Sequence, residues 1–392
     1  TRMKNKYEVG DIFRRYGKDY QKENILSFKK LKVMHNISVC RTAHLGGHIE
    51  QCDQCAFERI AYNSCRDRHC PKCQTMVKEK WLNDRKADLL PCNYFHMVFT
   101  LPHKLNPIIL TNKKVMLNNL FAAVNQTLQV FAKDPQWRLE GQVGFIGVLH
   151  TWSQKLTDHF HLHCLVAGGA LSFDKKRWIP SKNSFLFKAT SMAKEFKKRY
   201  LRLFEKAYLN DELIFQGKTT PYKFKKGFTS LLDSLFKVKW IVYAKRPFAG
   251  PEQVLEYLGR YTHRVAISNN RIKSIDNNKI SFDYKDRADN DAIKTMTISS
   301  HEFIRRFLLH VLPENFMKIR YFGFLSHRNK KQAINLIRKF IGSDMPLQEK
   351  TKETVLEMML RLTGQDISCC PICKKGKMTI IRGLPNQFLN SS

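Results

Sequence analysis

The chain has 392 residues, of which 43% are hydrophobic, and this is the composition of a folded globular protein with two or three domains. Lysine and arginine total 68 against 34 aspartate and glutamate residues, which gives a formal net charge of +34. A surplus of this size opposes compaction, so it excludes an ordinary, nearly neutral surface and favours a polyanionic partner such as nucleic acid.

The sequence also argues against export. It contains no run of 18 apolar residues, so we expect no membrane span. Residues 1–7 lack the apolar core of a secretory signal, and we therefore expect a cytoplasmic protein. In that reducing compartment the 11 cysteines are expected to be metal ligands and buried thiols rather than a disulfide framework.

The first predicted element is a helix over residues 11–36, with apolar residues at helical spacing. The segment that follows, from Cys40 to Cys73, is too short and too polar to fold around an apolar core alone. A small platform of this kind, rigidified by metal and carrying outward cations, suits DNA contact. The cations that we expect to make this contact are Arg66, Arg68 and Lys72.

Two cysteine pairs in this segment predict a zinc site. Cys52-x2-Cys55 and Cys70-x2-Cys73 have fourteen residues between them, and each pair places two thiolates on a tight turn. Two such pairs complete one tetrahedral site. Four interleaved residues form a second candidate set, in which His44 competes with His48, and together the two sets predict a cross-braced, two-zinc module: Cys40, His48, Cys65 and His69.

Strands and helices then follow at uneven spacing, which is typical of an α+β fold rather than a regular βαβ array. Strands are expected over 94–101, 143–152, 160–167 and 239–244, with two or three more within 271–298. The short polar turn between the second and third strands predicts a hairpin. Helices are expected over 112–133, 190–216, 223–236, after Pro251 and, as a basic region, over 300–341.

The third of these strands contains His161-Leu162-His163. Alternation along a strand puts both imidazoles on one face of the sheet, where they can hold one divalent ion and leave positions open for a phosphate oxygen. By itself the pattern also fits a half-buried strand with polar residues on one face.

Tyr257 and Tyr261 are four residues apart on the helix expected after Pro251, so both hydroxyls project from one face. A tyrosine can attack a phosphodiester and keep the bond energy in a phosphotyrosine, so that rejoining needs no ATP. The competing interpretation is a core stripe formed by Val254, Leu258 and Tyr261.

The last feature in chain order is a cysteine pair in the tail. Cys370-Pro-Ile-Cys373 resembles half of a zinc ribbon, and no second CxxC pair lies near it. The pair either binds metal with a distant partner or involves Cys369, and the sequence leaves these alternatives open.

Four motifs occur in a jointly specific order: NSCRDRHCPKC over 63–73, FHMVFTLP over 95–102, HLHCLVAGG over 161–169 and YLGRYTHRVAISN over 257–269. Together they resemble the rolling-circle transposases of bacterial insertion sequences. These form the paired-tyrosine branch of the HUH (His-hydrophobe-His) endonucleases, distant cousins of the Helitron transposases. The resemblance extends over nearly the whole chain, from about Val9 to the tail cysteines.

The resemblance implies an antiparallel sheet that carries the two histidines beside a tyrosine-bearing helix. It implies that His161 and His163 bind catalytic Mg²⁺ or Mn²⁺, and that Tyr257 and Tyr261 are nucleophiles that form 5′-phosphotyrosine. It further implies one-ended transposition of single-stranded DNA, in the nucleoid of a bacterium. Arg260 and Arg264, within the tyrosine motif, are expected to contact the DNA.

One part of the family pattern is incomplete. The third metal ligand is expected to be Gln154, on the strand next to His161, with His150 and His159 as alternatives. Phe160 stands where relatives often have proline.

The resulting division of the chain has four parts. They are an N-terminal helix with a zinc-binding domain (1–85), an HUH nuclease domain (86–300), a basic helical region (301–360) and a tail with the CxxC pair (361–392).

Other functions share part of these features. A replication initiator or a conjugative relaxase would use the same chemistry, but the zinc segment ahead of the histidine pair favours a transposase. A non-catalytic, zinc-dependent DNA-binding regulator would not need the tyrosines or the histidines. A metal-independent tyrosine recombinase would need an arginine pattern that the chain lacks. With no GxxxxGK[ST] loop, strand separation would fall to a host helicase or to supercoiling.

Overall fold

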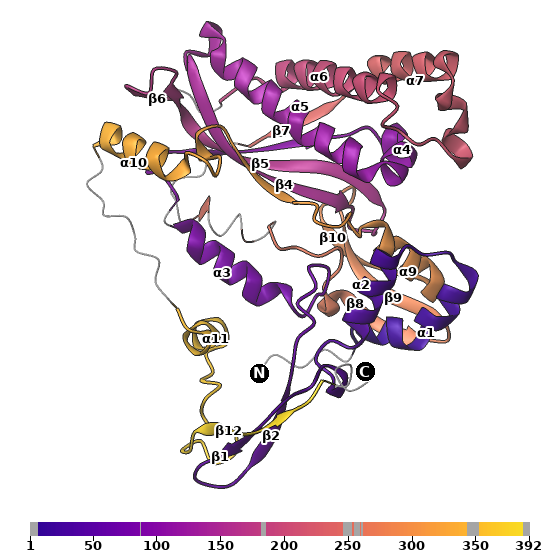
Figure 1. Ribbon diagram of the computed structural model, residues 1–392, viewed down its shortest axis with the longest axis vertical. Helices are drawn as coiled ribbons and strands as arrows, with labels where there is room; N and C mark the ends of the chain where they lie inside the picture. Colours follow the sequence, from indigo (N-terminus) through magenta and orange to yellow (C-terminus); the bar gives the residue numbers. More distant parts are fainter. Residues whose placement is uncertain are drawn as a thin grey trace. The chain divides into compact units, whose positions relative to one another are not determined.

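The computed structural model describes residues 7–386 apart from Ala87 and the stretches 182–185, 246–252, 255–258, 260–261 and 343–352. The chain forms two compact units, each assembled from separate segments (Figure 1). We call Thr1–Asn83, His263–Val311 and Glu349–Ser392 the cysteine unit. We call Asp84–Thr262 and Leu312–Gln348 the sheet unit. These units cross the boundaries drawn from the sequence, since 263–300 groups with the N-terminal segment.

The sheet unit is built on an antiparallel sheet, which confirms the α+β class predicted from the sequence. The strands are β3 (Tyr94–Thr100), β4 (Gly141–Trp152), β5 (Asp158–Ser172), β7 (Ile241–Ala244) and β11 (Ile319–Phe322). Their order is β11-β4-β5-β3-β7, and β6 (Trp178–Pro180) pairs with the far end of β5. The hairpin predicted from the polar turn is β4–β5, whose residues pair from Gly141↔Ser172 to Trp152↔Asp158.

Helices cover one face of this sheet (Figure 1). They are α4 (Asn106–Thr111), α5 (Lys113–Lys133), α6 (Ala189–Leu209) and α7 (Lys225–Lys237). Along β5, Phe160, Leu162 and Cys164 point into the core beneath these helices. The residues between them, His161 and His163, therefore lie on the opposite face of the sheet.

The cysteine unit contains two three-stranded antiparallel sheets. In one, β12 (Met378–Leu384) and β2 (Glu58–Tyr62) flank β1 (Gly47–Cys52), so a strand from the tail completes the N-terminal sheet. The other consists of β8 (Ile272–Asp276), β9 (Lys279–Asp286) and β10 (Ala292–Ser299), as expected for 271–298. The helices are α1 (Val9–Glu23), α2 (Phe28–Ser38), α3 (Gln74–Lys86, continuing into the sheet unit), α9 (Ser300–Leu309) and α11 (Val355–Thr363).

Three helix predictions were wrong in extent. The helix expected over 11–36 is two helices, because Asn24 adopts an extended conformation and Ser27 begins a new helix. The helix expected over 190–216 ends at Leu209. The basic region 300–341 is not continuous, since β11 interrupts it before α10 (Lys330–Ile341) and adds an edge strand to the sheet, where Phe322 stacks on Phe145 at 4.7 Å.

The helix expected after Pro251 falls largely outside the described residues. Among the residues that the structure does describe, no helix has the length and apolarity needed to cross a membrane.

Candidate functional site

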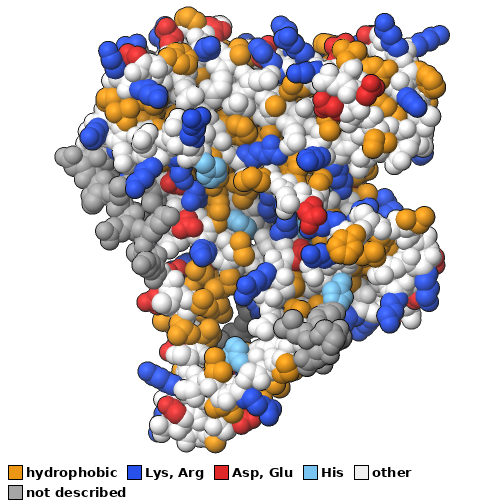
Figure 2. All heavy atoms as spheres, in the orientation of Figure 1, with side chains coloured by type: hydrophobic (Ala, Val, Ile, Leu, Met, Phe, Trp, Pro, Cys, Tyr) orange, Lys and Arg blue, Asp and Glu red, His pale blue; other side chains and the backbone are white. Residues whose placement is uncertain are grey.

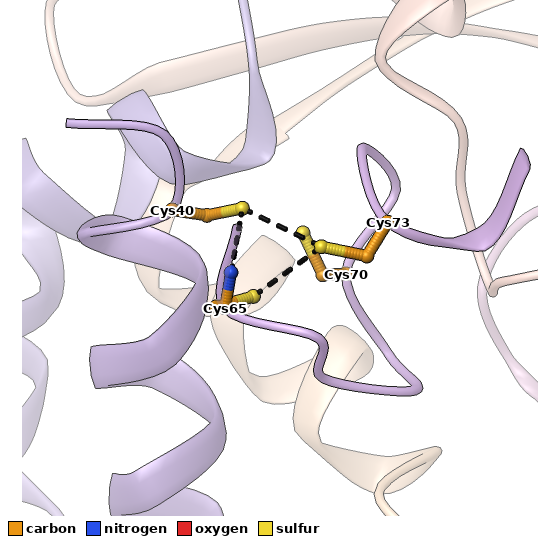
Figure 3. Close-up of side chains that lie close together, drawn as sticks. All are labelled: Cys40, Cys65, Cys70 and Cys73. Atoms are coloured by element: carbon orange, nitrogen blue, oxygen red, sulfur yellow. Dashed lines mark hydrogen bonds between the residues drawn. The ribbon is translucent and has the colours of Figure 1, made fainter. Parts of the chain in front are cut away.

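Four cysteines meet where the N-terminal helices give way to α3: Cys40, Cys65, Cys70 and Cys73 (Figure 3). Their ligand atoms all lie within 4.8 Å of one another, with Sγ–Sγ distances of 3.6 Å from Cys40 to Cys73 and 3.7 Å from Cys65 to Cys73. Tetrahedral zinc with Zn–S bonds of about 2.3 Å separates its sulfurs by about 3.8 Å. The cluster therefore matches the size of a zinc site.

Hydrogen bonds within this cluster shift the pKa values of its four thiols in both directions. Hydrogen bonds with Cys40, Cys65 and Cys70 hold the pKa of Cys73 well below its ordinary value. A hydrogen bond with Cys65 is the main cause that lowers the pKa of Cys40 to about 7. The same hydrogen bonds raise the pKa of Cys65 and Cys70 well above the ordinary value, so two of the four thiols favour thiolate, the form that binds zinc.

A second set of four cysteines joins the two ends of the chain. Cys52 ends β1, Cys55 lies in the turn to β2, and Cys370 and Cys373 precede β12. The Sγ–Sγ distances are 3.6 Å from Cys52 to Cys373 and 3.6 Å from Cys55 to Cys370. This set matches a zinc site as closely as the first set does.

The structure corrects the pairing that was predicted from spacing. The pairs Cys52/Cys55 and Cys70/Cys73 belong to different clusters, so they do not share one zinc. The two proposed histidine ligands are engaged elsewhere: His48 Nε2 lies 3.2 Å from Glu50 Oε1, and His69 Nδ1 lies 3.0 Å from Asp67 Oδ1. The two clusters are still cross-braced, because their ligands alternate along the chain, but the ligands differ from those predicted.

Three histidines converge on the face of the large sheet opposite the main apolar core: His150 on β4, and His161 and His163 on β5. Strand register explains this, because His150 pairs directly with His161, and His163 follows two residues later on the same face. All three are at least 91% buried, and their ligand nitrogens lie within 4.8 Å of one another. Three neutral imidazoles suit a divalent transition ion and leave further coordination positions for oxygen ligands.

Neighbouring groups orient two of these rings. His161 Nδ1 lies 2.9 Å from the carbonyl oxygen of His159, to which it can only donate. His163 Nδ1 lies 2.9 Å from His96 Nε2 on β3. Burial, and then the positive charge of Lys245, lower the pKa of His96 to about 3, so His96 is neutral at pH 7. His161 therefore presents Nε2 to a metal, and the contact with His96 fixes the orientation of the His163 ring.

The third member of this triad is His150, which the sequence offered as an alternative ligand. Gln154, the first choice, lies in the turn between β4 and β5 rather than on the strand beside His161. His159 lies on β5 with its ring 4.6 Å from that of His161 and outside the triad. His96 was missed as a site residue, and its only sequence signal was its position in the FHMVFTLP motif.

Some of the other predicted site residues are described by the structure and some are not. Tyr257, Arg260 and Tyr261 lie outside the described residues. Arg264 is exposed. Lys72 forms an ion pair with Glu8 at 2.7 Å, so it is not a simple outward cation.

Arg66 is exposed, as expected of an outward cation, whereas Arg68 is partly buried, and burial lowers its pKa. Lys and Arg side chains spread widely over the visible face, with fewer Asp and Glu among them (Figure 2). Two four-cysteine clusters and a histidine triad in so basic a chain define a metal-binding protein of the nucleic-acid-processing class.

Comparison with known proteins identifies the family. A family model described as "Transposase zinc-binding domain" matches residues 12–101, and one described as "Putative transposase" matches residues 144–333. The chain is 46% identical over 377 residues to "Putative transposase y4qJ" of Sinorhizobium fredii, covering 95% of this chain and 94% of that protein. It is 26% identical over 306 residues to "Transposase for insertion sequence element IS801" of Pseudomonas savastanoi pv. phaseolicola, covering 76% and 71%.

No solved structure matches the chain. The chain belongs to this family of transposases, which confirms the resemblance inferred from its motifs. The match to the zinc-binding domain includes both CxxC pairs of the N-terminal segment. It stops well before Cys370 and Cys373, so the structure adds the tail to the metal-binding part of the protein.

Proposed function

We propose that this transposase nicks and rejoins single-stranded DNA through 5′-phosphotyrosine intermediates, in a rolling-circle, one-ended transposition cycle. The observation that carries the proposal is the histidine triad on paired antiparallel strands. Its imidazoles are buried on the sheet face opposite the main apolar core, and their clustered nitrogens fit the requirements of a divalent ion.

In this proposal His150, His161 and His163 hold Mg²⁺ or Mn²⁺. A bound divalent ion polarises the scissile phosphate and orients it for in-line attack. The His159 carbonyl keeps His161 in the tautomer that coordinates, and His96 orients the His163 ring. The sheet supplies rigidity, because all of these groups lie on its strands.

Tyr257 and Tyr261 are the proposed nucleophiles. The phenol oxygen of one tyrosine bonds to phosphorus, the bond from phosphorus to the 3′ oxygen breaks, and the phenol proton passes to the departing 3′ hydroxyl. The 5′ end is then held as phosphotyrosine until a 3′ hydroxyl attacks it in the reverse reaction. Two tyrosines allow one strand to be held while the other strand is cut.

The cysteine unit is proposed to bind the transposon end, where Arg66, Arg68 and Arg264 contact the DNA backbone. Arg260, in the same motif as Arg264, is proposed to contact the DNA as well. The family membership and the zinc-binding match favour a transposase over a replication initiator or a relaxase with the same chemistry. Opening of duplex DNA is left to supercoiling or to a host helicase.

The decisive test uses labelled single-stranded DNA that contains a transposon end, incubated with purified protein and Mn²⁺. We expect a covalent protein–DNA adduct on a denaturing gel. His161→Ala and His163→Ala should abolish the adduct while DNA binding is retained, because the ion acts after docking. Chelation of the divalent ion should have the same effect.

The tyrosines are tested in the same assay. Each single variant, Tyr257→Phe or Tyr261→Phe, should block complete transposition while still forming one adduct, and the double variant should form none. Cleavage at a normal rate by the double variant would show that a metal-bound water or a carboxylate, not tyrosine, attacks the phosphate. Wild-type activity of the histidine variants would instead favour a non-catalytic DNA-binding regulator.

A further inference from the structure

A pocket of about 200 Å³ lies in the cysteine unit at the first turn of α3. Its walls come from two segments, 71–78 and 263–271. Lys78, Arg264 and Arg271 line it together with His263, and none of the described residues that line it is acidic. The pocket is therefore a concentration of positive charge within one compact unit.

The first cysteine cluster positions one wall of this pocket. Cys70 directly precedes Pro71, which lines the pocket, and Cys73 directly precedes Gln74, the first residue of α3. Gln74 and Thr75, in the first turn, line the pocket. The N–H groups of a first turn have no partner within the helix, and the helix dipole makes this end positive, so it favours an anion.

Arg271 forms part of the opposite wall and is held in place. Its Nε donates a hydrogen bond of 2.6 Å to the carbonyl oxygen of Asp283, and its guanidinium carbon lies 5.7 Å from the centre of the Phe282 ring. Burial, followed by the positive charge of Arg264, lowers the pKa of Arg271 to about 10. Arg264 and Arg271 thus both bring positive charge to the pocket that they line, and an anion bound there would be attracted to both.

The remaining wall is apolar. Val265, Ala266 and Ile267 line it, and the last two are buried. A water molecule has a share of about 30 Å³ in the liquid, so the pocket has room for more than a bare phosphate. A ligand that fits both walls carries an anionic group next to a compact apolar group, as a phosphate and its sugar do along a nucleic acid strand.

We propose that this pocket binds one phosphate of a DNA strand together with the adjoining deoxyribose. The proposal rests on the proposed function in taking DNA as the substrate, but it concerns docking and not cleavage. The pocket would place a contact with the DNA backbone in the same compact unit as the first cysteine cluster. The metal site and the DNA-binding pocket would then be held in one fixed arrangement.

Trp81, next to the pocket, can report ligand binding through its fluorescence. The Trp81 ring on α3 lies 5.7 Å from the ring of His263, which lines the pocket, and the other four tryptophans belong to the sheet unit. We would titrate the full-length, zinc-loaded protein with the dinucleotide pTpT and with inorganic phosphate, following tryptophan fluorescence. A Trp81→Phe variant identifies the part of the signal that comes from the pocket.

The key variant is Lys78→Gln combined with Arg264→Gln, which removes two positive charges from the pocket. It keeps Arg271 and its hydrogen bond to the carbonyl oxygen of Asp283. Lys285→Gln, at an exposed position on β9, is the control for loss of charge. We expect the double variant to bind pTpT and a single-stranded dT20 oligonucleotide at least tenfold more weakly, and the control to stay within twofold. Inorganic phosphate should bind wild type at least tenfold more weakly than pTpT, since it cannot use the apolar wall.

Unchanged affinity of the double variant for both probes would overturn the proposal. Equal affinity of wild type for phosphate and pTpT would also overturn it, since the site would then select an anion and not a strand. Zinc content, measured on every variant, separates a local effect from loss of the fold. No step requires nicking, so a protein that forms no tyrosine adduct can still bind through this pocket, and the two proposals fail independently.

Discussion

His96 is buried behind the histidine triad, and its hydrogen bond to His163 gives it a testable role in positioning that ligand. We expect His96→Leu to weaken Mn²⁺ binding by about 10–100-fold, because the ring of His163 loses the hydrogen-bond partner that orients it. His96→Gln, whose amide group can form a hydrogen bond with the same ring, should restore most of the affinity. Calorimetric titration with Mn²⁺ measures both, and equal losses in the two variants would reduce His96 to a packing residue.

A glycine closes the second cysteine cluster. A Cβ at Gly376 would lie 2.4 Å from Cys52 Sγ and 2.6 Å from Asp53 Oδ1, closer than any real contact. Gly376→Ala should therefore displace a metal ligand and lower the zinc content from two ions per chain to one. Gly383→Ala, in the same tail, meets nothing within 4 Å and should keep both ions. Elemental analysis of the purified proteins provides the test, and two ions in Gly376→Ala would contradict it.

The start of α9 carries a pH-dependent contact. Hydrogen bonds from Arg305, and then Arg306, lower the pKa of Glu302 to about 2. A depressed pKa stabilises the fold above the ordinary value for glutamate, about 4.3, and this contribution is lost as the pH falls towards 2. At pH 7 we expect Glu302→Gln to lower the melting temperature by roughly 1–3 °C, a small effect because the pair is partly exposed. The difference from wild type should shrink as the pH falls from about 5 to about 3.

At the scale of elements, the tail has a structural role in the N-terminal sheet. β12 pairs with β1 from Gly47↔Leu384 to Cys52↔Met378, and the turn before it supplies two cysteines. Deletion of residues 365–392 should remove one zinc ion and leave the cluster of Cys40, Cys65, Cys70 and Cys73 intact. Loss of both ions would contradict the independence of the two clusters.

Point variants separate the metal ligands from the strand. Cys370→Ser should reproduce the loss of one zinc ion, because it removes a member of the second cluster. The adjacent Cys369→Ser should keep both ions, since Cys369 lies outside that cluster. Zinc stoichiometry again provides the measurement, and equal effects of the two substitutions would argue for a general disturbance of the tail.

At the scale of the whole molecule, the net charge of +34 should control DNA affinity. Each phosphate that the protein neutralises releases counterions, so the logarithm of the binding constant falls linearly with the logarithm of salt concentration. With six or more phosphate contacts on a single strand, affinity should fall by about 300-fold or more between 50 and 200 mM salt. Binding to single-stranded DNA that is indifferent to salt over this interval would exclude the basic surface as the main source of affinity.

The sequence by itself determined the features that depend on neighbours in the chain. Alternation identified the strand that carries His161 and His163, the polar turn identified the β4–β5 hairpin, and CxxC spacing identified each cysteine pair as a metal half-site. These follow from short-range geometry, since a strand repeats every two residues and a tight turn brings two thiolates together whatever the rest of the chain does.

Only the tertiary structure decided which half-sites share a metal and which residue completes the triad. Cys55 and Cys370 are 315 positions apart, and their contact depends on β12 pairing with β1. His150 joins His161 through the register of β4 against β5, which spacing alone does not specify. A half-site is satisfied by any partner of the right chemistry, so the identity of that partner depends on the path of the whole chain.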